Sequence, residues 1–364
     1  MDLLWSLLSI TCLFLQLEGC TRVIKPNTIV VDVDMTLSTP STCRNVMLQC
    51  GEHGPSVYWQ RKKQNIGKGS ELTIHVEDFP DAGNFTCHND NGDILNHTLV
   101  LIQVTKNDRG EHPKQILQEI SDQIYIKCET KNYSGVFECS WNLNMNPNKV
   151  QILFEAHRSN SSISCTVHNQ DKSRAVCHEL TYCPFQEELE KVVFNLHAIN
   201  GPHFENYSSE FFLADIVKPE KVQIYKKDEG DKKVVVSWEY PESWDHPHSY
   251  FPLTFEVKVL KALKNKHNCD HEVRSDPRTP NHKVPHKGSY HFFTEETSLQ
   301  LNHSTKKYIF CVRAKDMYCN SPWSEWSAIV LRDPGQQCWL KDYYYALCFL
   351  KHRYSLCHMW HLGP

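Results

Sequence analysis

The feature that most constrains the fold is a short motif near the C-terminal end, Trp323-Ser324-Glu325-Trp326-Ser327. It follows residues 308–315, whose apolar and polar side chains alternate as in a β-strand. In such a strand Arg313 and Lys315 point to the same face. The two indoles of the motif can then interleave with these two cations. The simplest interpretation is structural: the ladder fastens the edge of a β-sandwich.

A second signature lies about one domain upstream. Cys128 and Cys139 bracket a short segment that leads into Trp141. The two signatures, in this order, resemble the cytokine-receptor homology module, which consists of two fibronectin type III-like sandwiches. The resemblance implies an elbow that grips a helical cytokine, and therefore protein recognition.

Length and charge exclude several classes of protein. A chain of 364 residues is long enough for two or three domains, and its 39 Lys and Arg against 43 Asp and Glu give no excess charge for a nucleic acid. The apolar run Leu3–Leu17 is too short to span a bilayer and sits where a secretory signal belongs. We therefore expect residues 1–20 to be a signal peptide. No later stretch is long and apolar enough for a membrane anchor, which predicts a secreted, extracellular protein.

Cysteines and glycosylation sequons fit this route. The chain has 16 cysteines, most of which should be paired in the secretory pathway. Six sequons are candidates for glycosylation, although short sequons also arise by chance. They begin at Asn84, Asn96, Asn132, Asn160, Asn206 and Asn302.

The first domain is expected over residues 23–105. Cys50, Trp59 and Cys87 follow one another in the order of an immunoglobulin sandwich, in which a disulfide between the sheets packs against a buried indole. Phe85 occupies the place of the usual corner tyrosine, and we expect the fold to tolerate the missing hydroxyl. The domain is either structural or a receptor-binding module.

Two further sandwiches are expected over residues 115–215 and 218–332, after a polar linker at 107–113. The first contains Cys128, Cys139 and a second candidate pair, Cys165 with Cys177, and the segment 207–213 is predicted to be its last strand. The second begins after Lys218-Pro219, and its residues 234–238 are typical of a buried strand. The predicted fold class is all-β: one immunoglobulin-like sandwich followed by two fibronectin type III-like sandwiches.

Long unbroken strings extend the resemblance over roughly residues 23–330. They are Cys128-Glu-Thr-Lys-Asn-Tyr-Ser-Gly-Val-Phe-Glu-Cys139, Phe204-Glu-Asn-Tyr-Ser, the segment from Phe211 to Pro219, Val236-Ser-Trp-Glu-Tyr-Pro241 and the segment from Pro247 to Phe255. They resemble the interleukin-12 subunit beta family. The resemblance implies a soluble, receptor-like subunit that pairs with a four-helix alpha chain, as a secreted heterodimeric cytokine that acts on a class I cytokine receptor. Whether homodimers form stays open.

The resemblance also implies site residues. Cys183 stands where the family bonds covalently to its helical partner, and its alternative is a free or mispaired thiol. Four residues match the surface that receives an arginine from the partner: Tyr133, Tyr250, Asp316 and Tyr318. A guanidinium can bond a carboxylate in bidentate fashion while its faces stack on phenol rings. The alternative is that the tyrosines only pack and that Asp316 is an exposed local cap.

One family disulfide cannot form here, because Asn302 lines up near the position of one of its cysteines. Cys269, Cys311, Cys319 and Cys338 supply alternatives, and pairing of Cys311 with Cys319 is one of them. The partners of Cys43, Cys348 and Cys357 stay open. Residues 333–364 form a tail outside the resemblance. A docked helix or hairpin, an inter-chain disulfide arm and translated non-coding sequence are its alternatives, and we favour an appendage without function.

Catalytic and metal-binding motifs are weak. No phosphate loop, nucleophile elbow or His-Glu-x-x-His helix is present, so we expect no enzyme and no cofactor. A metal site built from Cys348, Cys357, His358 and His361 would not have a standard zinc spacing.

Two other functions compete with a cytokine subunit. A soluble or decoy receptor would bind a helical cytokine reversibly and would not need Cys183. An adhesion protein built from sandwiches would explain the folds but not the joint presence of the two receptor signatures.

Overall fold

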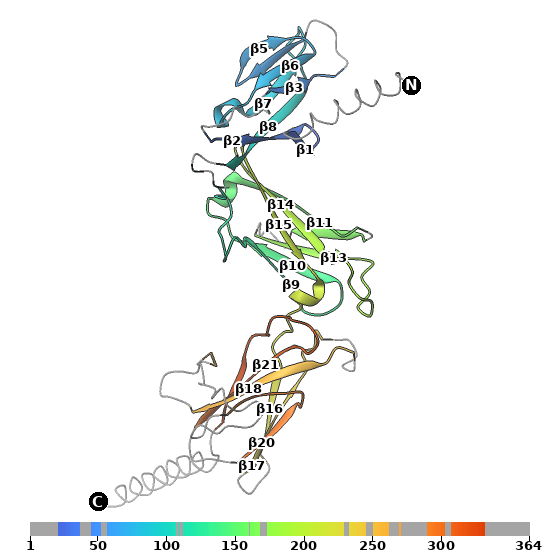
Figure 1. Cartoon of the computed structure of the whole chain (residues 1–364), viewed down its shortest axis with the longest axis vertical. Helices are drawn as coiled ribbons and strands as arrows, with labels where there is room; N and C mark the ends of the chain where they lie inside the picture. The colour runs from blue at the N-terminus through green and yellow to red at the C-terminus, as the bar shows by residue number, and fades with distance from the viewer. Residues whose placement is uncertain are drawn as a thin grey trace, which may run out of the picture. The chain divides into compact units, whose positions relative to one another are not determined.

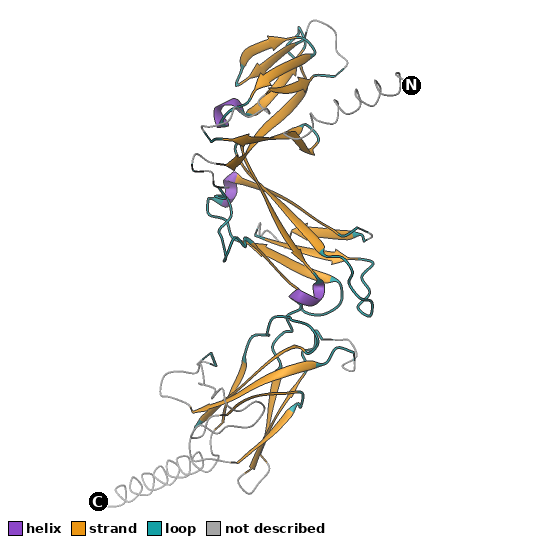
Figure 2. Cartoon of the chain, viewed as in Figure 1, coloured by secondary structure: helices purple, strands orange, loops and turns teal. Residues whose placement is uncertain are grey.

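The computed structural model describes residues 21–36, 45–51, 57–106, 109, 111, 113–159, 161–167, 173–228, 233–244, 250–261, 269–270, 290–302 and 307–331. These residues form mainly β-strands with a few short helical turns (Figures 1 and 2). No helix among them is both long enough and apolar enough to cross a membrane. The predicted signal peptide and the tail at 333–364 lie outside the described residues.

The chain divides into two compact units. The first comprises Met1–Cys128, Phe137–Tyr182 and Glu187–Phe211, and the second comprises Glu129–Val136, Cys183–Gln186 and Phe212–Pro364. Two short segments of the second sandwich therefore belong to the unit that contains the third sandwich. Both carry residues that the sequence singled out, Tyr133 and Cys183.

The first sandwich packs around Trp59, which is completely buried beside the Cys50–Cys87 disulfide. Strands β3 and β6 form one of its sheets, and β8, β7, β4 and β5 lie in order in the other, with β1 and β2 on the far side of β8. Phe85 is also buried, and the Arg61 guanidinium lies 5.1 Å from its ring centroid. The ring thus packs without the hydroxyl of a corner tyrosine. The strands are β1 Thr21–Lys25, β2 Thr28–Asp34, β3 Asn45–Gln49, β4 Tyr58–Arg61, β5 Gln64–Lys68, β6 Glu71–His75, β7 Gly83–His88 and β8 Ile94–Lys106.

The second sandwich has one sheet in the order β12-β13-β10-β9 and another in which β11, β14 and β15 are neighbours. Its last strand begins earlier than the sequence analysis predicted. β14 and β15 form a hairpin that turns at Gly201, whose φ of 60° favours glycine, so Phe204 is already in the strand and buried. The strands are β9 Ile126–Glu129, β10 Val136–Trp141, β11 Val150–His157, β12 Ile163–Val167, β13 Arg174–Glu179, β14 Val192–Asn200 and β15 His203–Phe211, followed by the helix α2 Leu213–Ile216.

Within the first unit, the first two sandwiches share a sheet and a small core. His203 in β15 pairs with Ile102 in β8, in parallel orientation. Val30 and Leu101 of the first sandwich pack in one buried cluster with Ile199 and Phe204 of the second. Burial of this apolar surface stabilises the junction.

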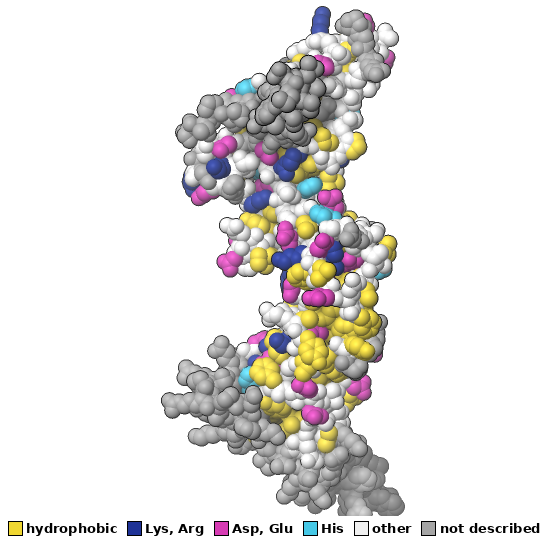
Figure 3. All heavy atoms as spheres, turned by 45° about the vertical axis from the view of Figure 1, so that its right-hand side comes forward, with side chains coloured by type: hydrophobic (Ala, Val, Ile, Leu, Met, Phe, Trp, Pro, Cys, Tyr) yellow, Lys and Arg dark blue, Asp and Glu magenta, His cyan; other side chains and the backbone are white. Residues whose placement is uncertain are grey.

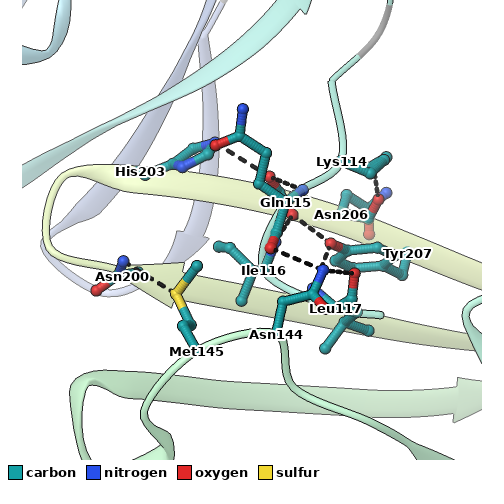
Figure 4. Close-up of polar contacts among 11 residues, drawn as sticks. Lys114, Gln115, Ile116, Leu117, Asn144, Met145, Asn200, His203, Asn206 and Tyr207 are labelled. Carbon is teal, nitrogen blue, oxygen red and sulfur yellow. Dashed lines mark hydrogen bonds and ion pairs between the residues drawn. The ribbon is translucent and has the colours of Figure 1, made fainter. Parts of the chain in front are cut away.

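A buried carboxylate fastens the chain that enters the second sandwich (Figure 4). Glu205 is 2% exposed and accepts hydrogen bonds from the backbone N–H groups of Gln115 at 2.8 Å and Ile116 at 2.9 Å. The Tyr207 hydroxyl also donates to Glu205, and it accepts from the N–H of Leu117 at 2.9 Å. Because bonds to a buried carboxylate are strong, this network gives the segment one defined path.

The third sandwich packs around Trp238, whose indole contacts the rings of Phe255 and Phe310. Its sheets have the orders β16-β17-β20 and β19-β18-β21-β22. Strand β17 contains the predicted segment 234–238, and β21 extends the predicted strand by one residue. The strands are β16 Gln223–Asp228, β17 Lys233–Glu239, β18 Leu253–Lys261, β19 Tyr290–Thr294, β20 Ser298–Asn302, β21 Tyr308–Asp316 and β22 Ser327–Leu331.

Four disulfides lie within the described residues. The pairs in the first two sandwiches are Cys50–Cys87, Cys128–Cys139 and Cys165–Cys177. In the third sandwich Cys311 bonds to Cys269, and Cys319 is a free thiol, so the alternative of a Cys311–Cys319 pair is wrong. Cys311 points into the core with Leu260 and Ile309, where Cys269 reaches it. Cys43, Cys338, Cys348 and Cys357 lie outside the described residues.

Candidate partner-binding surface

The tryptophan motif forms the ladder that alternation predicted. The Arg313 guanidinium carbon lies 5.0 Å from the ring centroid of Trp323 and 4.4 Å from that of Trp326, and Lys315 lies 5.2 Å from Trp323. Two hydrogen bonds also connect the motif to β21. Ser324 N–H donates to Ala314 O at 2.7 Å, and Ser324 Oγ accepts from Ala314 N–H at 2.9 Å. This geometry agrees with the structural interpretation of the motif.

Glu256 supports the ladder from β18. Its carboxylate is 5% exposed as a side chain and accepts from Arg313 Nε at 2.6 Å and from His291 Nε2 at 2.8 Å. Burial alone would raise the pKa of Glu256, but the hydrogen bonds from His291 and Arg313, with the charges of Arg313 and Lys258, lower it. Glu256 thus holds the Arg313 guanidinium in contact with both indoles.

The residues predicted to receive a partner's arginine divide into a buried pair and an exposed pair. Tyr133 is 5% exposed and donates a hydrogen bond from its hydroxyl to Asp316 Oδ2 at 2.9 Å. Asp316 is only 1% exposed, so the alternative of an exposed cap is wrong in that respect. It does cap the local turn, because Oδ1 accepts from the N–H groups of Tyr318 at 2.8 Å and Cys319 at 2.9 Å.

The other two predicted residues lie at the surface. Tyr250 is 65% exposed and Tyr318 is 73% exposed. Tyr250 connects to the buried pair through rings: it contacts Phe185, Phe185 contacts Phe251, and Phe251 contacts Tyr133 with centroids 4.6 Å apart. Figure 3 shows hydrophobic side chains gathered on one face of the molecule, below the middle of the view.

Burial controls protonation at this site. It raises the pKa of the Tyr133 phenol, and the hydrogen bond to Cys319 and the negative charge of Asp316 raise it further. Burial likewise raises the pKa of the Cys319 thiol, whose Sγ lies 3.4 Å from the Tyr133 hydroxyl. Tyr133 and Cys319 are therefore neutral at physiological pH, and Asp316 faces neutral hydrogen-bond donors.

Cys183 is a free and exposed thiol. It begins the segment Cys183–Gln186, which belongs to the same unit as Tyr133 and Asp316. A turn closes this segment, since Gln186 N–H donates to Cys183 O at 3.2 Å. The intradomain disulfides use the other cysteines of the second sandwich.

Four residues of this surface were not predicted from the sequence. Phe185, Phe251 and Trp244 were not singled out, although Phe185 follows Cys183-Pro184 and Phe251 follows Tyr250. Trp244 packs edge-on to Tyr133 with centroids 5.7 Å apart. Cys319 was considered only as a disulfide partner. Adjacency to a predicted residue was the available signal for Phe185, Phe251 and Cys319, and Trp244 had none.

The sequon asparagines differ in environment. Asn84 is exposed, whereas Asn96 and Asn206 are half-buried. Asn132 is half-buried too, and its Nδ2 donates to Ser243 O at 2.6 Å. Asn160 and the side chain of Asn302 lie outside the described residues.

Within the described ranges no cluster of three or more His, Cys, Asp or Glu side chains is arranged to hold a metal ion. The candidate set Cys348, Cys357, His358 and His361 lies outside those ranges.

Comparison with known proteins assigns the family. Residues 123–200 match the family described as the C-terminus of cytokine interleukin-12p40. The chain is 31% identical to interleukin-12 subunit beta of Lama glama over 330 residues, which cover 84% of this chain and 92% of that protein. It is 32% identical to the human and the Felis catus interleukin-12 subunit beta, with the same coverage. Since relatives more than 30% identical match over 84% of this chain, the chain belongs to the interleukin-12 subunit beta family, which consists of cytokine subunits and not of enzymes.

Proposed function

We propose that the chain is the secreted, receptor-like beta subunit of a heterodimeric cytokine. It pairs with a four-helix alpha subunit through the surface of Tyr133, Tyr250, Asp316 and Tyr318 and through an inter-chain disulfide at Cys183. The heterodimer then signals through a class I cytokine receptor. Family membership and the geometry of this surface support the proposal.

The observation that carries the proposal is the buried carboxylate of Asp316. Its hydrogen bonds come from two backbone N–H groups and from the neutral Tyr133 hydroxyl. None of these donors carries a positive charge. A buried charge without a counter-charge is costly, and an arriving cation relieves that cost.

An arginine is the cation that fits. Its planar guanidinium donates to a carboxylate and stacks on aromatic faces, and Tyr250 and Tyr318 offer exposed rings on the same unit. A lysine ammonium would give the charge without the flat stack. We therefore expect the alpha subunit to insert an arginine toward Asp316.

Cys183 distinguishes this proposal from a soluble or decoy receptor. A reversible receptor does not need a free, exposed thiol beside its ligand surface, whereas a permanently paired subunit does. Secretion is proposed from the predicted signal peptide at 1–20. The domain limits 23–105, 115–215 and 218–332 are proposed from the sequence patterns. We assign receptor contact to the immunoglobulin-like domain.

Co-secretion tests the function. The full chain is expressed with each of a panel of four-helix cytokine alpha chains, and captured partners are identified on non-reducing gels. We expect one or more covalent heterodimers. The Cys183→Ser chain should lose the covalent band and retain a noncovalent complex. A covalent band that survives Cys183→Ser would reject the role of this cysteine, and capture of no helical chain by wild type would reject the function.

A further inference from the structure

The loop that carries Cys183 is closed at its base by one guanidinium. Arg158 pairs through Nη2 with Glu188 at 2.7 Å and through Nη1 with Glu179 at 3.4 Å. Their side chains are largely buried, with 12% exposure for Arg158, 10% for Glu188 and 3% for Glu179. Because both carboxylates meet the same cation, the two ends of residues 180–187 are held together, and the loop samples fewer conformations.

The tip of the loop is held by aromatic contacts. The Phe185 ring meets Tyr250 edge to face, with centroids 5.4 Å apart and planes at 78°, and meets Phe251 at 5.6 Å. Phe185 is nevertheless 61% exposed. Its ring is therefore not part of a core, and the contacts join the loop to the same aromatic residues that lead to Tyr133.

Only one residue, Pro184, separates Cys183 from this anchor. Phe185 follows Cys183 and Pro184, and the proline ring fixes the φ angle between them. The turn from Gln186 N–H to Cys183 O closes around Phe185. The contact of the Phe185 ring with Tyr250 thus anchors the turn that begins at Cys183.

We propose that Phe185 is a positioning residue for the inter-chain disulfide: it holds the Cys183 thiol beside the arginine-binding surface, so that a bound alpha subunit meets the thiol in a reactive arrangement. This inference rests on the proposed function. Disulfide exchange requires the attacking thiolate to approach a disulfide sulfur along one direction, so a fixed loop raises the effective concentration of the thiol in the complex.

The chemistry can be followed with oxidised glutathione as the oxidant. The Cys183 thiolate attacks glutathione disulfide, whose sulfur–sulfur bond breaks, and one glutathione thiolate leaves. A thiolate of the bound alpha subunit then attacks the Cys183 sulfur and releases the second glutathione. The two protein thiols are oxidised, and one glutathione disulfide is reduced to two glutathione molecules.

A first experiment needs no partner. Hydrogen exchange of residues 183–187 is measured in the free full chain by mass spectrometry. Phe185→Ala should speed exchange there, and Phe185→Tyr should restore protection because it keeps the ring. Leu189→Ala is the matched control, since Leu189 is an exposed apolar residue just after the loop, at 80% exposure. Equal exchange in wild type and Phe185→Ala would overturn the inference.

A second experiment measures coupling to the alpha chain captured by wild type, with oxidised glutathione. Phe185→Ala should slow disulfide formation by roughly three- to tenfold, the equivalent of losing one or two aromatic contacts. Noncovalent affinity, measured in a Cys183→Ser background, should fall by less, and Phe185→Tyr should couple at the wild-type rate.

Equal losses of rate and affinity would make Phe185 a direct partner contact and overturn its positioning role. Unchanged coupling with a partner that wild type captures would refute the inference alone. If wild type captures no helical chain, the proposed function fails and the inference fails with it.

Discussion

Tyr133 donates its hydroxyl hydrogen bond to Asp316 at 2.9 Å, across 183 positions of sequence. The two residues belong to the same compact unit, although Tyr133 lies on the Glu129–Val136 segment of the second sandwich. The bond is buried, and its acceptor is a carboxylate, so it contributes more than a neutral surface bond. It therefore fixes this segment and at the same time orients the proposed binding carboxylate.

Removing the Tyr133 hydroxyl should destabilise this unit. Tyr133→Phe keeps the ring contacts with Trp244 and Phe251 but takes one donor from the buried Asp316. We expect a loss of about 1.5–3 kcal/mol, read as a lower denaturant midpoint for unfolding. Tyr318→Phe is the control, because Tyr318 is 73% exposed and should leave the midpoint unchanged. Equal midpoints for Tyr133→Phe and wild type would contradict the importance of this bond.

Truncating Asp316 should weaken partner binding. Asp316→Ala removes the proposed counter-charge for an arginine, which costs on the order of 2–5 kcal/mol, or at least roughly thirtyfold in affinity. The affinity is measured in a Cys183→Ser background so that the disulfide cannot mask the loss.

Asp316→Asn separates charge from folding. The amide oxygen can still accept from the N–H groups of Tyr318 and Cys319, so the turn is kept while the charge is lost. Both variants should bind weakly if the charge matters. Normal affinity of Asp316→Asn would exclude an ionic role for this residue.

Local patterns predicted much of the fold. Alternation located β21 and the cation faces of Arg313 and Lys315, because side chains in a strand point to opposite faces. The order of Cys50, Trp59 and Cys87 indicated the first sandwich, because a disulfide and an indole pack together in its core.

Contacts between distant segments were harder to predict. The pairing of Cys311 with Cys269 spans 42 residues, and spacing alone does not choose among several cysteines. The burial of Asp316 depends on Tyr133, which reaches it from another sandwich. Phe185 is an ordinary exposed aromatic until its contacts with Tyr250 and Phe251 are known. These features arise from tertiary packing, which the local alternation of apolar and polar residues does not predict.

Among the described residues, the two free thiols should react at different rates. Cys183 is exposed, whereas burial raises the pKa of Cys319. A raised thiol pKa lowers the thiolate fraction at any given pH, and the thiolate is the nucleophile. With iodoacetamide at pH near 7.5, alkylation should therefore occur at Cys183 first and reach Cys319 only at higher pH. Peptide mass mapping checks this, and equal rates at both sites would contradict it.

The same burial gives a stability change with pH. The pKa of Cys319 is higher in the folded chain than in the unfolded chain. The contribution of the neutral thiol to the stability of the fold is therefore present below the unfolded pKa and is lost as pH rises through the folded pKa. Cys319→Ala should reduce the fall in stability at alkaline pH. The readout is the thermal midpoint against pH, compared with the wild-type chain.

The tryptophan ladder should weaken in acid. Hydrogen bonds from His291 and Arg313 hold the pKa of Glu256 below its usual value against the effect of burial. Its stabilisation is therefore present above the unfolded carboxyl pKa of about 4.3 and is lost as pH falls through the lower folded pKa. Glu256→Gln should lower the thermal midpoint at neutral pH and flatten its acid dependence. An unchanged acid profile would contradict a role of Glu256 in the ladder.

Deletion of the immunoglobulin-like domain tests whether receptor contact and pairing with the alpha subunit use different domains. Deleting residues 23–104 should spare heterodimer secretion, because the proposed pairing surface lies in the other unit, and should abolish receptor signalling. The deletion also uncovers Ile199 and Phe204, which pack against Val30 and Leu101, and exposed apolar surface promotes aggregation. Ile199→Ser is therefore added to the deleted chain.

The full-length Ile199→Ser chain is the matched control for this deletion. It should be secreted as a heterodimer and signal, because the substitution leaves the first domain in place. The deleted chain should form the same heterodimer without signalling. Signalling at normal potency after the deletion would show that the first domain is only structural. Loss of the heterodimer itself would place part of the pairing surface in the first domain, contrary to the assignment made from Tyr133, Asp316 and Cys183.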